Sequence, residues 1–219
     1  MFKLWVVFLL LGSPTASRAC RADFDEAPTN IELLERADLV VLAKLVGTSN
    51  NTEMWDKHIV LEPLRALKGT APPNLTISGF IRDRESGEPI RSFPTALGQS
   101  HPSSAWGTCN RAAYSPGALV LAIFERTPDG LRESADPWAR SIEDVEGPDG
   151  LWVRAATLYL RIISQNPPRH RRKAFEKERE RLLASPEEPD SKAIAEDIGW
   201  YLAATSAEGP RPYSNQSRR

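Results

Sequence analysis

The chain has 219 residues, of which 41% are apolar and 26% charged, and its formal net charge is −1. Such values are typical of a globular protein and leave no charge excess to hold nucleic acid or an anionic membrane surface. Two cysteines and three dispersed histidines (His58, His101, His170) cannot build a structural four-ligand zinc site. No phosphate-binding loop, dinucleotide fingerprint, nucleophile elbow or zinc-protease motif occurs, so we expect no intrinsic metal, no cofactor and no enzymatic activity.

The first 19 residues have the layout of a secretory signal peptide. A single cation, Lys3, precedes the apolar run Leu4–Leu11. The small residues Ser17 and Ala19 favour cleavage after Ala19. The run is far shorter than the roughly 20 residues that span a bilayer, which argues against a transmembrane segment. The sequence therefore predicts an exported chain, extracellular or periplasmic, that begins at Cys20. Lipid modification of Cys20 is the alternative, which Arg18 disfavours because lipoprotein signals carry a small residue at that position.

Cys20 and Cys109 are the only cysteines. In an exported chain we expect them to form a disulfide, because oxidising compartments preserve such bonds. The bridge would close a loop of about 90 residues and add roughly 4.5 kcal/mol in the chain-entropy picture. The alternative is two free thiols, which are unusual outside the cytoplasm.

The next part of the chain predicts a short helix and several strands. Asn30 is placed to cap the helix formed by IELLERA. Long branched apolar runs predict buried strands, and Pro63 within one of them predicts a bulge or an edge. The polar stretch Ile81–Pro116 has no periodicity, which is typical of a mobile or functional loop. The predicted strands are Asp38–Gly47, Lys57–Gly69, Asn74–Phe80, Ala118–Glu125 and a short partner of the last, Gly130–Ser134. Strands at this spacing favour a small closed β-barrel.

From residue 136 the pattern becomes helical. Apolar residues recur at helical spacing in three segments: LWVRAATLYLRIISQ, RRKAFEKERERLLAS and DSKAIAEDIGWYLAAT. We expect residues 135–148 to be a linker, residues 149–205 a separable helical annex and residues 206–219 a disordered tail. Four acidic residues of the linker region could hold calcium only weakly, because they lack the spacing of a calcium loop. These are Glu143, Asp144, Glu146 and Asp149.

Several of these features occur in a familiar order. An N-terminal cysteine after a signal peptide is followed by ADLVVLAKLVG, a second strand that closes on ALKG, a polar insertion, and SSAWGTC before GALVLA. Together they resemble the N-terminal domain of tissue inhibitors of metalloproteinases and the wider netrin-like group, over about residues 20–134. The resemblance implies a five-stranded OB-fold barrel whose first cysteine is bridged to the position of Cys109. With the annex the fold class would be α+β.

The chain also departs from that family. The inhibitors begin with C-x-C, whereas here Ala22 stands in the place of the second cysteine and the chain would be a single-disulfide member. The cysteine-rich C-terminal domain is missing as well. The resemblance therefore supports the fold more than the activity.

The resemblance also implies a mechanism of inhibition. In the family, the α-amine and carbonyl oxygen of the first residue chelate the zinc of a protease, the role that Cys20 would take here. Arg21 lies where the family places a small residue, so a target would need a deep or acidic pocket. Trp106 and Tyr114 near Cys109 are candidate recognition residues, with packing on the disulfide as the alternative. The expected partner is a secreted zinc metallopeptidase; the alternative function is a non-inhibitory envelope module that binds a protein or glycan.

Overall fold

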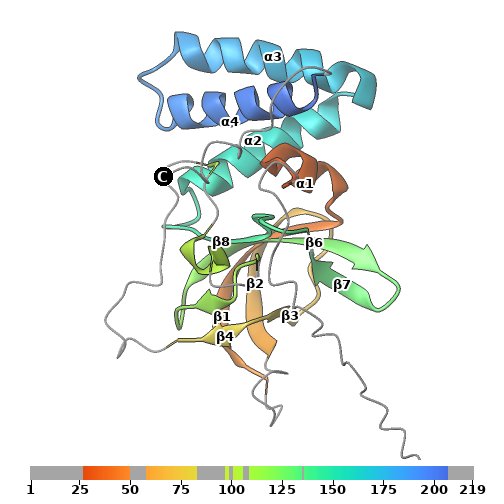
Figure 1. Cartoon of the computed structure of the whole chain (residues 1–219), viewed down its shortest axis with the longest axis vertical. Helices are drawn as coiled ribbons and strands as arrows, with labels where there is room; N and C mark the ends of the chain where they lie inside the picture. Colours follow the sequence, from red (N-terminus) through yellow and green to blue (C-terminus); the bar gives the residue numbers. More distant parts are fainter. Residues whose placement is uncertain are drawn as a thin grey trace, which may run out of the picture.

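The computed structural model describes residues 27–49, 58–82, 97–98, 101–105, 109–134 and 136–206. The predicted signal peptide, Cys20, Arg21, Trp106 and residues 207–219 of the predicted tail lie outside these ranges. The described part consists of a strand-rich half and, after it in the chain, a group of helices (Figure 1). The predicted α+β fold class is thereby confirmed.

Five antiparallel strands form a nearly closed barrel, which is consistent with an OB-like fold. Their order across the sheet is β3-β2-β1-β6-β7, so that the central pair joins segments far apart in the sequence. The strands are β1 (Leu39–Thr48), β2 (His58–Lys68), β3 (Leu75–Ser78), β6 (Leu119–Thr127) and β7 (Gly130–Glu133). Each of them overlaps a predicted strand.

The central strands β1 and β6 are buried on both faces. On β1, Leu39 and Val41 point into the barrel, whereas Val40 and Leu42 pack in a cluster shared with the helices. The residues of β6 alternate between the same two clusters. Because successive side chains of a strand point to opposite faces, a strand covered on both sides needs a nearly unbroken apolar run. The two longest apolar runs of the predicted strands, in Asp38–Gly47 and Ala118–Glu125, form these two central strands, β1 and β6.

Strand β2 is irregular where the sequence contains proline. Leu42 of β1 pairs with Arg65 and the next residue, Ala43, pairs with Pro63, so Leu64 is an extra residue in the ladder. An extra residue of this kind is a β-bulge, which bends the strand and increases its twist. The bulge predicted from Pro63 is confirmed.

Three short strands and one 3-10 helix lie outside the predicted strands and helices, except that Phe80 of β4 was expected to end the strand Asn74–Phe80. They are β4 (Phe80–Ile81), β5 (Ala113–Tyr114), β8 (Ile142–Asp144) and the 3-10 helix Pro102–Ala105. Strand β4 pairs in parallel with β5, and β8 pairs antiparallel with β6. The segment expected to be a linker, residues 135–148, therefore contributes a strand to the sheet.

The first helix begins one residue earlier than a cap at Asn30 would require. In α1 (Asn30–Arg36) the N-cap is Thr29, whose side chain accepts the backbone N–H of Glu32 while the Glu32 carboxylate accepts the N–H of Thr29. This reciprocal arrangement is a capping box. The predicted cap at Asn30 is wrong because Thr29 and Glu32 have the required spacing, and the side chain of Asn30 donates instead to Asp197.

The remaining helices are α2 (Leu151–Gln165), α3 (Pro168–Ala184) and α4 (Ser191–Ala204). All three were predicted, although α3 begins at Pro168, ahead of the predicted start, because proline fits the first turn of a helix. None of the helices in the described part of the chain is long and apolar enough to cross a membrane.

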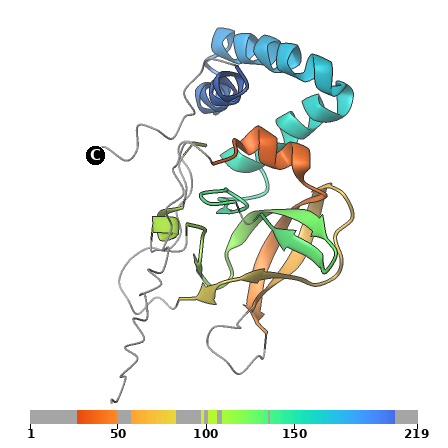
Figure 2. The same cartoon turned by 45° about the vertical axis from the view of Figure 1, so that its right-hand side comes forward.

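The helices and the barrel share one hydrophobic core. Helices α1 and α2 lie next to the barrel, and α3 and α4 form an outer layer (Figures 1 and 2). The shared cluster contains Val40 and Ile123 from the sheet, Leu34 from α1 and Trp152 from α2. A division of the chain near residue 135 stays a prediction, but the apolar core extends across that boundary.

Candidate functional site

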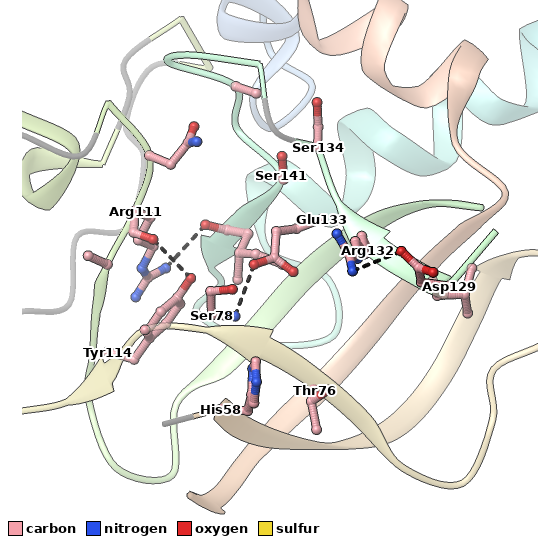
Figure 3. Close-up of a pocket in the computed structure, with 16 residues that line it drawn as sticks. His58, Thr76, Ser78, Arg111, Tyr114, Asp129, Arg132, Glu133, Ser134 and Ser141 are labelled. Atoms are coloured by element: carbon pink, nitrogen blue, oxygen red, sulfur yellow. Dashed lines mark hydrogen bonds and ion pairs between the residues drawn. The ribbon is translucent and has the colours of Figure 1, made fainter. Parts of the chain in front are cut away.

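The two end strands of the barrel, β3 and β7, leave a seam between them. At one point the backbone N–H of Ser78 on β3 donates to the Glu133 carboxylate on β7, with a distance of 2.9 Å. A cavity of about 780 Å³ lies along the seam and is lined by both strands (Figure 3). Among the cavities of the described residues, we choose this one as the candidate site because side chains of many polar types meet there.

Most of the residues that line the seam cavity have polar side chains. Strand β3 contributes Thr76 and Ser78, and β7 contributes Arg132 and Glu133. The segments 110–112 and 139–142 form further parts of the walls and contribute Asn110, Arg111 and Ser141. The Oγ atom of Ser141 is buried and has no hydrogen-bond partner in the described part of the chain.

The end of β3 is held tightly against the segment 110–112. Gly79 has φ 139°, and a Cβ atom at this position would lie 2.6 Å from the Ala112 carbonyl oxygen and 2.7 Å from the Tyr114 ring. No other residue type fits both the backbone conformation and the space. The backbone N–H of Phe80 donates to the same Ala112 oxygen at 2.9 Å. This contact fixes one end of the seam cavity.

Arg111 anchors one wall through a buried ion pair. Its guanidinium lies 2.8 Å from the Asp144 carboxylate of β8, and both side chains are almost inaccessible to solvent. The same guanidinium stacks on Tyr114, 4.3 Å from the ring centroid. Burial raises the pKa of the Tyr114 phenol, despite the opposing effect of Arg111, so the phenol remains neutral. Tyr114 is 1% exposed, which favours packing over surface recognition for this predicted site residue.

Two of the four acidic residues named for the linker region, Glu143 and Asp144, form ion pairs with arginines. Glu143 lies 3.2 Å from Arg140, and both are buried, while Asp144 pairs with Arg111. No group of three or more metal-binding side chains occurs among the described residues.

Cys109 lies beside the seam cavity, directly before its Asn110–Ala112 wall. It has φ 57° and packs in a small cluster with Ala27 and Trp138. The backbone N–H of Trp138 donates to its carbonyl oxygen at 2.7 Å. Ala27 and Cys109, which are far apart in the sequence, thus belong to the same buried cluster. The predicted bridge to Cys20 stays a prediction.

Sequence reasoning did not find the seam residues Arg111, Glu133 and Ser141. The sequence did contain a signal for Glu133. It lies in the predicted strand Gly130–Ser134, and the last strand of a five-stranded barrel forms one side of the opening between its two end strands. Arg111 and Ser141 have no such signal, because their positions depend on β5 and β8. The assembled site supplies hydroxyl, amide and backbone groups that suit hydrogen bonding to a polar, extended ligand.

Comparison of the chain with protein-family models gives no match, and comparison with curated proteins gives none either.

Proposed function

We propose that this chain is an exported protein-binding barrel that inhibits a zinc metalloendopeptidase through a mature N-terminus at Cys20. The observation that carries the proposal is the cluster of Ala27, Cys109 and Trp138. The cluster supports the proposal because Ala27, seven positions after Cys20, packs beside Cys109, the residue that the resemblance assigns to the bridge.

The reach of the chain is compatible with this role. Cys20 precedes Ala27 by seven positions, and an extended chain spans about 3.3–3.6 Å per residue, or roughly 24 Å in all. A bridge to Cys109 would hold the first residue rigidly at the end of the barrel. The α-amine of that residue, with a pKa of about 7.7–8.0, gives up its proton readily enough to bind zinc near neutral pH.

The test compares two forms of the protein against a panel of zinc endopeptidases. One form begins at Cys20, and the other carries one extra residue before it. The extension converts the basic amine into an amide and fills the space beside the metal, so inhibition should disappear while the melting temperature stays unchanged. Arg21→Thr should broaden the set of inhibited enzymes, because it removes a cation that must be desolvated in the target pocket. Equal potency of the two forms, or no inhibition at micromolar concentration, would refute the proposal.

The second candidate is a non-inhibitory interaction module that binds a protein or glycan partner. The seam cavity favours it, because a cavity of about 780 Å³ with many polar side chains in its lining can hold part of such a partner without any contribution from Cys20. This candidate predicts that an extension before Cys20 leaves binding unchanged.

A further inference from the structure

We propose that the seam between β3 and β7 accepts an extended peptide of a partner protein as an additional strand, antiparallel to both. The inference deepens the interaction-module candidate by naming the kind of partner, and it does not depend on Cys20.

The directions of the strands allow one inserted strand to pair with both edges. Strand β3 runs parallel to β1, because β2 is antiparallel to each of them. Strand β7 also runs parallel to β1, because β6 is antiparallel to each. The two end strands therefore run in the same direction. A strand placed between them in the opposite direction continues the antiparallel pattern on both sides.

The backbone groups of both edges face the seam. The N–H of Ser78 points into it, toward Glu133, and residues two apart in a strand orient their backbone groups alike, so Thr76 does the same. On the other side, Thr127 pairs with Gly130 across a two-residue turn, which directs the backbone of the next residue, Leu131, away from β6. Both edges therefore offer donors and acceptors of the kind that an added strand requires.

The continuation of the β3 edge already binds a strand through its backbone, although in the parallel direction. Beyond Gly79, the N–H of Phe80 donates to Ala112 and the N–H of Arg82 donates to Tyr114, at 2.9 and 3.0 Å. This pairing of β4 with β5 ends where the seam cavity begins. Within β3 itself, the Glu133 carboxylate accepts the N–H of Ser78 where a backbone carbonyl of a neighbouring strand would otherwise lie.

The cavity also indicates which side chains the peptide would carry. Its charged arginines have acidic partners, since Arg132 pairs with Asp129 and Arg111 with Asp144. The hydroxyl of Ser141 is buried, but the side chain of Ser78 is exposed on the cavity wall. Serine or threonine at the inward positions of the peptide would hydrogen-bond with the Ser78 hydroxyl. The predicted ligand is thus an extended segment with small polar residues at alternate positions.

The test uses a phage-displayed library of random linear heptapeptides, selected against the full mature chain. A synthetic peptide of the most enriched sequence should alternate small polar residues and shift the NMR amide signals of Thr76, Ser78 and Leu131. Thr76→Pro should weaken its binding at least tenfold, because proline lacks the edge N–H and is tolerated at sheet edges. Thr76→Ala retains that N–H and should bind within about twofold of the original chain. Glu133→Ala should strengthen binding severalfold, because it frees the N–H of Ser78.

Three results would overturn the proposal. One is the absence of any enriched peptide. Another is equal binding by Thr76→Pro and Thr76→Ala, with circular dichroism showing that both are folded. The third is a concentration-dependent dimer that Thr76→Pro abolishes, which would make a second copy of the chain the occupant. A form extended by one residue before Cys20 should bind the peptide normally, so failure of the inhibitor proposal leaves this result unaffected.

Discussion

Asp197 of α4 is a carboxyl group held in the interior by neutral donors. The Tyr159 hydroxyl donates to its Oδ2 atom at 2.7 Å, and the Asn30 amide donates to Oδ1 at 2.9 Å. Burial raises the pKa of Asp197 to about 6, and the two hydrogen bonds and the nearby Arg140 only partly oppose this effect. The carboxyl thereby joins α1, α2 and α4 through a group that titrates close to neutral pH.

The raised pKa of Asp197 has a definite effect on stability. Between about pH 4 and pH 6 the folded state holds a proton that the unfolded state, with a pKa near 3.9, has lost. The free energy of unfolding should therefore rise by up to about 3 kcal/mol, relative to Asp197→Asn, as the pH falls from 7 to 4. Urea denaturation of both proteins at several pH values measures this difference. Parallel pH profiles would contradict the expectation.

Two ion pairs of this chain have the same spacing and the same distance but differ in burial. Arg140–Glu143 and Arg132–Asp129 both span three positions and both measure 3.2 Å, yet the first is almost fully buried and the second is mostly exposed. Glu143→Ala should lower the free energy of unfolding by about 3–5 kcal/mol, because it leaves a buried guanidinium without its carboxylate. Asp129→Ala, as the matched control, should cost less than about 1 kcal/mol. Chemical denaturation measures both, and similar losses would contradict the role of burial.

The stability of helix α1 depends strongly on its capping box, because the helix is short. It has seven residues, too few to be stable alone, and its first turn is satisfied by Thr29 and Glu32. Thr29→Ala should cost about 1–2 kcal/mol of unfolding free energy. The control is Thr157→Ala in α2, where the hydroxyl donates to the carbonyl of Val153 inside the helix. That change should stay within about 0.5 kcal/mol by thermal denaturation, because such a bond adds little to a helix. Equal losses would show that the cap is not the cause.

Strand β8 is an element that could not be predicted from the sequence. The apolar runs of β1 and β6 and the stripe of α2 were sufficient to predict those elements, because burial by itself determines their pattern. Ile142–Asp144 contains two acidic residues and was interpreted as part of a linker. Its burial depends on Arg140 and on the distant Arg111, and pairing between residues far apart leaves no periodic signal in a sequence. The seam cavity was missed for the same reason, since its walls include residues placed by β5 and β8.

At the scale of the whole molecule, the barrel and the helices cannot separate without exposing apolar surface. Val40 and Ile123 of the sheet and Trp152 of α2 belong to one buried cluster. Because each part covers the other, we expect the mature chain to unfold in a single transition, with coincident far-UV and near-UV circular dichroism curves. Two resolved transitions would instead support the annex as an independent unit, as its composition suggested.

The pairing of β1 with β6 also determines the order in which the barrel can assemble. Leu39 pairs with Phe124, so the ends of a long intervening segment must meet before the centre of the sheet exists. The meander β1-β2-β3 involves much shorter loops and pays a smaller entropic cost, so it can form first. Closure onto β6 is then the slow step. Mutations at Ile77 of the early meander and at Ala122 of β6 should therefore both mainly slow folding, because the contacts of both residues are made by the time the barrel closes, and stopped-flow refolding measures this effect. The speed of folding is thus governed by one strand pair at the centre of the sheet.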